Sequence, residues 1–349
     1  MKGTKLRNPL SIFATVTMVA PVLIAAGAIW GGVWALAGWL WISVLTLLLD
    51  ELVGATLETS EGEEFPAADG LSLALAVIHF GLWILVVFVV GNSTNLATWE
   101  KCLVVLSAGL FMGQVSNSNA HELIHRPGRW SRRAGRWVYI SVLFGHHTSA
   151  HPLVHHVHVG THSDPSTARK GEGFYRFFIR AWIGGFREGL KAENKRFPRL
   201  NRPVWHHPYI AYIFGAAIFF VAALLIGGPT GGLTALCLGG LAQVQLMQAD
   251  YVQHYGLSRK ILSNGTPEPV SDRHSWNAPH FMSSALMLNA PRHSDHHANP
   301  LRPFPSLRLS ADMPMLPRAL PVMAFLALFP TIWHRVMDRR AAQWQNRDQ

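Results

Sequence analysis

Histidines gather in three short stretches of this sequence, at spacings that suit the binding of metal ions. Two stretches place a pair of histidines four residues apart, and the third combines spacings of three and four. Side chains three or four residues apart on a helix lie on the same face, so each stretch would direct its imidazoles together. The eight candidate ligands are His121, His125, His151, His155, His156, His293, His296 and His297.

A ninth candidate, His254, directly follows an apolar stretch, where a helix would emerge beside the other groups. Imidazole ligands suit iron, zinc and copper. A catalytic zinc takes about three protein ligands, so nine imidazoles predict two metal ions rather than one. Iron is the expected metal, because histidines at a membrane face suit oxygen chemistry on a lipid-soluble substrate, while the residues alone leave zinc and copper open.

The second stretch contains more histidines than a metal site needs. His146, His147, His158 and His162 crowd around it, so spacing alone does not decide which of them bind metal. A single pair of histidines four residues apart is a weak motif with a high false-positive rate. Three groups on the same predicted side of a membrane are stronger, because ionisable groups at membrane spans are usually functional.

The composition predicts that these histidines belong to a membrane protein. Of the 349 residues, 49% are hydrophobic and only 14% are charged, against about 25% charged in soluble domains. The apolar residues form long runs, and a membrane-crossing helix needs about 20 of them. We therefore expect one all-α, membrane-embedded domain over residues 1–349, with six transmembrane helices at about 10–30, 32–49, 71–90, 99–118, 208–226 and 230–249.

The charge distribution predicts which side of the membrane carries the histidines. Lys2, Lys5 and Arg7 place the start of the chain in the cytoplasm under the positive-inside rule, and an even number of spans returns the histidine stretches to that side. The same rule explains the net charge of +10, so nucleic acid is not an expected partner. Both cysteines lie in apolar runs and no C-x-x-C pair is present, so electrons would come from another protein.

Four blocks of the sequence resemble the integral-membrane alkane 1-monooxygenases, within the fatty acid desaturase and hydroxylase superfamily. His121-Glu-Leu-Ile-His-Arg126 resembles the first histidine box of that family, and Arg292-His-Ser-Asp-His-His-Ala298 resembles the last. His151 to His156, with Asp164 to Glu172 downstream, resembles the second box. Asp250 to Leu257 resembles the family's Asn-Tyr-x-Glu-His-Tyr-Gly-Leu pattern.

This resemblance implies a pair of iron ions held by the nine histidines, and it selects His151, His155 and His156 as the ligands of the second box. It implies hydroxylation of a medium- or long-chain alkane to a primary alcohol with O2 and electrons from rubredoxin, itself served by rubredoxin reductase. It also implies a place among the lipids of the bacterial inner membrane, with the active site facing the cytoplasm. Beside the ligands we expect Glu122, Gln253, Asn277 and Asp295.

The blocks also depart from the family's pattern. Ala150 and Val154 replace a glutamate and a glycine of the second box, while Asp250 and Gln253 stand where the family has asparagine and glutamate. These changes bear on metal tuning and substrate preference. An alkyl-aromatic methyl hydroxylase and a fatty-acyl desaturase of the same superfamily are therefore the nearest alternatives.

A membrane metal transporter is the alternative from another class. It predicts ligands along a path through the spans, whereas the histidines here lie at one membrane face, with His79 as the main exception. An enzyme would instead need a substrate channel between its spans. Candidates for limiting the chain length of the substrate in that channel are Trp34, Trp39 and Trp41.

Overall fold

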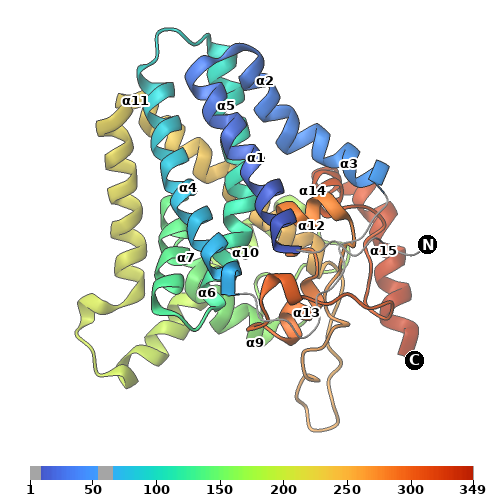
Figure 1. Cartoon of the computed structure of the whole chain (residues 1–349). Coiled ribbons are helices and arrows are strands. Elements are labelled where there is room, and N and C mark those ends of the chain that lie inside the picture. The colour runs from blue at the N-terminus through green and yellow to red at the C-terminus, as the bar shows by residue number, and fades with distance from the viewer. Residues whose placement is uncertain (1–8, 54–65, 349) are drawn as a thin grey trace.

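The computed structural model describes residues 9–53 and 66–348, and among these residues the regular structure is helical apart from two isolated β-bridges. Long helices stand side by side in a bundle, and shorter helices gather at one end of it (Figure 1). The predicted all-α fold is confirmed for these residues. Lys2, Lys5 and Arg7, on which the predicted orientation depends, lie outside the described residues.

The bundle consists of apolar segments whose backbone hydrogen bonds are satisfied within each helix, as a lipid environment requires. Two sets of consecutive segments, over residues 32–53 and 98–125, each continue as one rod. The segments are α1 (Pro9–Trp30), α2 (Gly32–Leu40), η1 (Trp41–Leu45), α3 (Thr46–Val53), α4 (Pro66–Asn92), α5 (Thr98–Phe111), η2 (Met112–Ser116), α6 (Asn117–His125) and α11 (Pro208–His254).

The chain is an integral membrane protein. Within the part of the chain that the structure describes, four helices are long and apolar enough to cross a membrane, and they span Leu10–Trp30, Gly32–Leu52, Ala67–Asn92 and Pro208–His254. Six spans were expected. The difference arises because α11 contains a non-helical break at Gly227 and Gly228, so its two arms hold the fifth and sixth expected spans. The span expected at 99–118 lies in the rod that η2 divides.

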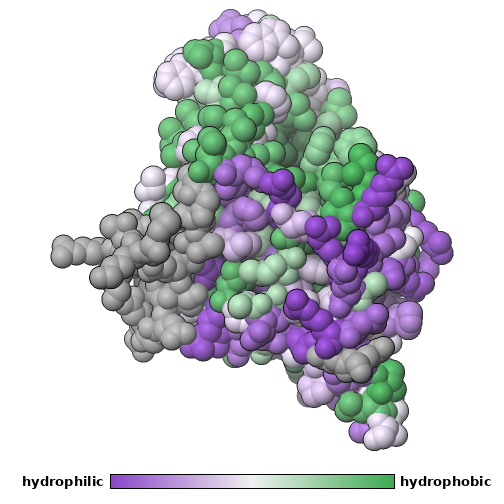
Figure 2. All heavy atoms as spheres, turned by 90° about the vertical axis from the view of Figure 1, so that its right-hand side faces the viewer, coloured by the Kyte–Doolittle hydropathy of each residue, from purple (hydrophilic) through white to green (hydrophobic). Residues whose placement is uncertain are grey.

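The remaining helices, most of them short, cover the end of the bundle at which α6 finishes (Figure 1). One face of the molecule is hydrophobic over the bundle and hydrophilic over this end (Figure 2), as expected where a protein leaves the bilayer. The helices are α7 (Arg129–Ser141), α8 (His147–Ala150), η3 (His151–His155), α9 (His156–His158), α10 (Phe174–Arg196), η4 (Phe197–Leu200), η5 (Val204–His206), α12 (Phe281–Leu286), α13 (His293–Ala298), η6 (Phe304–Ser306), α14 (Leu320–Ala327), α15 (Pro330–Gln345) and η7 (Asn346–Asp348).

The break in α11 packs so tightly against α4 that glycine is required at the contact. A Cβ atom added to Gly91 would lie 2.4 Å from the Cα atom of Gly227. The Nδ2 group of Asn92 donates a hydrogen bond to the carbonyl of Ile226 at 2.8 Å, which fixes the two helices beside this contact. The contact sets the direction of the second arm of α11, which ends at His254.

Replacing Gly91 with alanine should lower the melting temperature of the purified protein in detergent. The added methyl group overlaps backbone atoms of the facing helix, and such overpacking costs about 1–3 kcal/mol. Gly81→Ala is the matched control, because a Cβ atom at that exposed position of α4 meets nothing within 4 Å. Equal melting temperatures for the two variants would contradict a close contact between α4 and α11.

Candidate metal site

Nine histidines converge at the end of the bundle and form two groups. Each offers one ring nitrogen, and within a group these nitrogens all lie within 4.8 Å of one another. One group contains His121, His125, His151, His156 and His296, and the other contains His155, His254, His293 and His297. These are the nine residues selected in the sequence, and that they bind metal remains a prediction. The other histidines of the second stretch, all described in the structure, belong to neither group.

Five elements far apart in the sequence deliver these side chains. α6 carries the first two histidines at the end of its rod, η3 and α9 carry the next three, and α11 contributes its last residue. α13 supplies the remaining three and divides them, because His296 belongs to one group while His293 and His297 belong to the other. The site is therefore assembled only when the whole bundle is folded.

The second stretch is wound more widely than the expected α-helix. His151–His155 form the π-helix η3, in which hydrogen bonds connect residues five apart. The Nε2 atoms of His151 and His156 consequently lie 2.9 Å apart, while His155 joins the other group. A regular α-helix would instead have placed His151 on one face with His155, so the spacing alone does not predict how this stretch is divided between the groups.

Ring nitrogens within each group face one another at distances that a shared metal ion would produce. In the first group the Nε2 atoms of His121 and His151 are 2.7 Å apart. In the second, Nε2 of His293 lies 3.0 Å from that of His254 and 3.1 Å from that of His297. Two nitrogens bound at right angles to one ion, each at about 2.1 Å, stand roughly 3 Å apart.

Each group also contains a buried ring nitrogen for which the structure shows no hydrogen-bond partner. Nε2 of His125 is such an atom in the first group and Nε2 of His155 in the second, and Nδ1 of His151 and of His297 are also without a partner. Buried polar atoms normally have a partner, because leaving one unpaired is costly. A metal ion in each group would satisfy both Nε2 atoms, so the residues present fit a pair of metal ions.

The electrostatic setting keeps most of these rings neutral, which is the form that binds a metal. Burial lowers the pKa of His151, His293 and His296 well below the usual histidine value, and neighbouring histidines lower it further. Burial acts in the same direction on His155, but the carboxylate of Asp164 outweighs it, so the pKa of His155 is raised.

Asp164 orients His155, although it was not among the residues expected beside the ligands. Its Oδ2 atom accepts hydrogen bonds from Nδ1 of His155 at 2.8 Å and from Oγ1 of Thr167 at 2.7 Å, and its Oδ1 atom accepts one from the backbone N–H of Ser166 at 3.0 Å. With the proton on Nδ1, the lone pair on Nε2 faces the second group. The sequence contained one indication of this role, because Asp164 begins the run to Glu172 that lies downstream of the second histidine stretch.

Two of the expected neighbours stabilise the chain around α6 and α13 rather than contacting a histidine ring. Glu122 accepts hydrogen bonds from Arg126 and from the backbone N–H of Phe304 at 3.2 Å. Asp295 forms an ion pair with Arg302. Both carboxylates are buried, so these pairings hold the segments that carry His121, His125 and the α13 histidines in place.

The other two expected neighbours also act through the backbone. Asn277 accepts a hydrogen bond from the backbone N–H of Ser294 at 2.9 Å and donates one to the carbonyl of Ser275 at 3.0 Å. Oγ of Ser275 lies 3.4 Å from Nδ1 of His254. Gln253 donates to the carbonyl of Ala290 at 3.0 Å. These bonds connect α13 to the end of α11, and thereby connect the three histidines of the second group that those helices carry.

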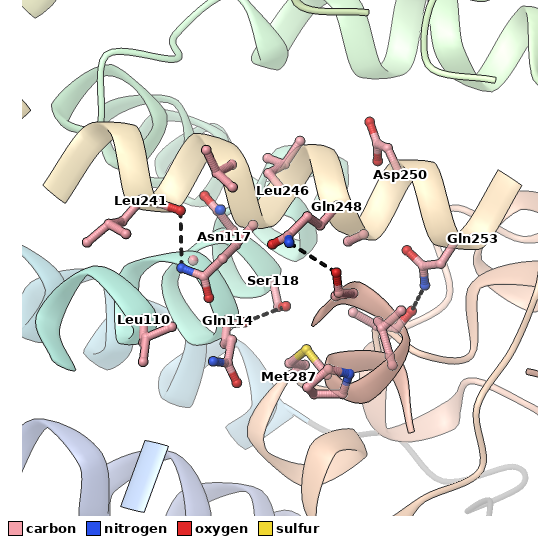
Figure 3. A pocket seen from close by; sticks show the side chains of 18 of the residues that line it. Leu110, Gln114, Asn117, Ser118, Leu241, Leu246, Gln248, Asp250, Gln253 and Met287 are labelled. Carbon is pink, nitrogen blue, oxygen red and sulfur yellow. Dashed lines mark hydrogen bonds between the residues drawn. The ribbon is translucent and has the colours of Figure 1, made fainter. Parts of the chain in front are cut away.

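A largely apolar cavity of about 380 Å³ reaches both histidine groups. His121, His151 and His293 are among the residues that line it, together with apolar side chains such as Leu241 and Met287 (Figure 3). Its volume is in the range of about 300–1,000 Å³ typical of small-molecule sites. The cavity can therefore bring a small apolar molecule to the histidines.

The tryptophans expected to limit chain length do not line this cavity. Trp34, Trp39 and Trp41 are absent from its lining, and Trp34 is exposed on the outside of the bundle. The cavity lies farther along the rod, beyond these positions. The residues of that rod that line it are Ile42, Ser43, Thr46 and Leu47.

Comparisons with known proteins agree with this arrangement. Residues 97–327 match the sequence profile of the fatty acid desaturase family. The chain is similar to alkane 1-monooxygenase 1 of Alcanivorax borkumensis, with 30% identity over 97% of this chain and 85% of that protein, and to alkane 1-monooxygenase 2 of Pseudomonas aeruginosa, with 32% identity over 86% and 83%. It is also 26% identical to the hydroxylase component of xylene/toluene monooxygenase from Pseudomonas putida, over 94% and 89% of the two chains.

Replacing Asp164 with asparagine should weaken metal binding by about 10- to 100-fold, the usual effect of losing a carboxylate that orients a histidine ligand. The asparagine cannot hold the Nδ1 proton of His155 as firmly. Metal retained per chain after dialysis against graded chelator, measured by elemental analysis, reports this change. Asp312→Asn, at an exposed position, is the control, and equal retention by the two variants would contradict the role assigned to Asp164.

Proposed function

Because the chain belongs to the alkane 1-monooxygenases of the fatty acid desaturase family, we propose that it hydroxylates the terminal methyl group of a medium- or long-chain alkane. The reaction would consume the alkane, O2, two electrons and two protons, and yield a primary alcohol and water. The observation that supports it most strongly is the pairing of two histidine groups, one partly and one fully buried, with one apolar cavity that reaches both.

Iron is the metal we propose for the two groups, one ion in each. When bound, the ions would supply the activation of O2 that the side chains of the protein cannot provide. Zinc has no redox chemistry, so it fits poorly with relatives that are named monooxygenases. Imidazole ligands suit iron as well as copper, and membership of the fatty acid desaturase family favours iron.

The protein's own residues would bind and orient the substrate. A hydrocarbon in the cavity would be enclosed by side chains such as Leu110, Leu241 and Met287, which exclude water from the reacting carbon (Figure 3). Because His121, His151 and His293 line the cavity, the proposed metal site would lie at its wall. An apolar chain has no polar groups to hold it, so the shape of the cavity would decide which carbon reacts.

Electrons would come from rubredoxin, supplied by its reductase, with the site on the cytoplasmic face of the bacterial inner membrane. The absence of a C-x-x-C pair supports an external iron–sulfur donor. Helix α7 presents Arg129, Arg132 and Arg133 as exposed residues, and such basic side chains suit both a cytoplasmic position and an acidic protein partner.

An alkyl-aromatic methyl hydroxylase is the second candidate, favoured by the similarity to a hydroxylase component named for xylene and toluene. Transport of metal ions is less well supported. The nine histidines lie at one end of the bundle rather than along it. His79 inside α4 belongs to neither group, and its Nε2 atom lies 2.7 Å from Oγ of Ser141.

The test is expression in a host that does not oxidise alkanes, together with rubredoxin and its reductase. Supplied with octane or hexadecane, cells should release the matching primary alcohol when they carry the parent chain. His296→Ala should abolish the product, because it removes a ligand from the first group. His206→Ala, which changes an exposed histidine outside both groups, should leave the product unchanged.

Parallel cultures supplied with toluene or xylene separate the two candidates. Benzylic alcohols without alkanols would replace the alkane proposal by the aromatic one. If neither substrate gives a product but the purified chain holds about two irons, alkane hydroxylation would be contradicted and the proposed metal site would still be supported. Chains without bound iron would overturn the proposed chemistry altogether.

A further inference from the structure

Asp250 is a buried carboxylate with one oxygen atom that has no hydrogen-bond partner. It lies on α11 one helical turn before His254, has 6% of its surface exposed and lines the cavity. Its Oδ2 atom has no hydrogen-bond partner in the structure. A buried charge in this state is costly unless an opposite charge lies near it, so Asp250 requires an explanation that packing alone does not give.

Among the described residues, no lysine or arginine forms an ion pair with Asp250. The groups that interact with it are the imidazole of His155, the hydroxyl of Ser166, the phenol of Tyr139 and the carboxylate of Asp164, whose charge has the same sign. Two carboxylates therefore stand near His155, a member of the second histidine group.

Positive charge from bound metal ions would resolve this arrangement. Neutral imidazoles contribute no net charge, so divalent ions in the two groups would bring uncompensated positive charge into a buried region. Buried ions are tolerated when charges of opposite sign lie close by. Asp164 provides one such charge through its hydrogen bond with His155, and Asp250 would provide a second one from α11.

The sequence around His254 suggests how this chain came to carry the charge at position 250. The pattern that the block resembles has asparagine there and glutamate at position 253, whereas this chain has Asp250 and Gln253. The number of carboxylates is the same, and the two positions are three residues apart, on neighbouring parts of one helix face. Gln253 is engaged through its Nε2 group with the carbonyl of Ala290.

We propose that Asp250 is a positioning residue that compensates the charge of the bound metal ions, in place of a carboxylate at position 253. It would strengthen metal binding and lower the reduction potential of the site. This inference rests on the proposed metal site and not on the identity of the substrate.

The test compares Asp250→Asn, which removes the charge at nearly constant shape, with Gln253→Glu and with the double variant. Asp250→Asn should bind iron about tenfold more weakly, as for other residues that support metal ligands, and its midpoint potential in spectroelectrochemical titration should rise. In the double variant, the iron affinity and the midpoint potential should return towards the values of the parent. Asp250→Glu, which keeps the charge, should retain most of the iron affinity and a midpoint potential close to that of the parent. It is the variant to compare with the parent if Asp250→Asn folds poorly.

Melting temperatures distinguish charge compensation from a structural role. In metal-free protein, prepared with chelator, Asp250→Asn should melt at a higher temperature than the parent, because an unpaired buried charge is gone. In iron-loaded protein it should melt at a lower temperature. A lower melting temperature in both states would assign Asp250 a structural role and overturn the proposal.

The remaining outcomes are equally decisive. A parent that holds about two irons, with an Asp250→Asn variant of unchanged affinity and potential, would overturn this inference alone. A parent that binds no iron would overturn the proposed function, and this inference with it.

Discussion

Convergence of nine imidazoles, six of them buried and three half-buried, is the constraint on which the rest of the structure depends. Ring nitrogens that face one another at about 3 Å, such as those of His254 and His293, gain nothing from each other unless a proton or a cation lies between them. Burial disfavours the charged, doubly protonated ring, since it lowers the pKa of rings such as His293. A hydrogen bond between two neutral rings satisfies one pair at a time, whereas Nε2 of His293 faces the nitrogens of both His254 and His297. A metal ion would satisfy this geometry, and the fold holds the rings in the arrangement that an ion would need.

The helical bundle meets this requirement by bringing distant segments to one end. The glycine contact between α4 and α11 directs the last arm of α11 towards His254. Within the described residues three π-helical segments occur, η1, η2 and η3, and each contributes residues to the lining of the cavity. Widened turns re-aim side chains without ending a helix, so the same irregularity shapes the cavity wall and divides the histidines between two groups.

Much of this could be predicted from the sequence, because it depends on local pattern. Apolar runs of about 20 residues indicated the spans, and the clustering of histidines indicated the nine residues that the structure brings together. The partition into groups could not be predicted, since the π-turn that separates His155 from His151 depends on tertiary packing. The contact between Asp164 and His155 was not predicted, because it depends on how the loop after the second histidine stretch packs. The cavity was expected beside Trp34, Trp39 and Trp41, and its true position likewise depends on tertiary packing.

The most direct test of the central claim is an experimental structure of the purified protein with anomalous scattering recorded on both sides of the iron absorption edge. The account predicts two iron peaks, one enclosed by the five histidines of the first group and one by the four of the second. A single peak, or peaks outside the two groups, would contradict it.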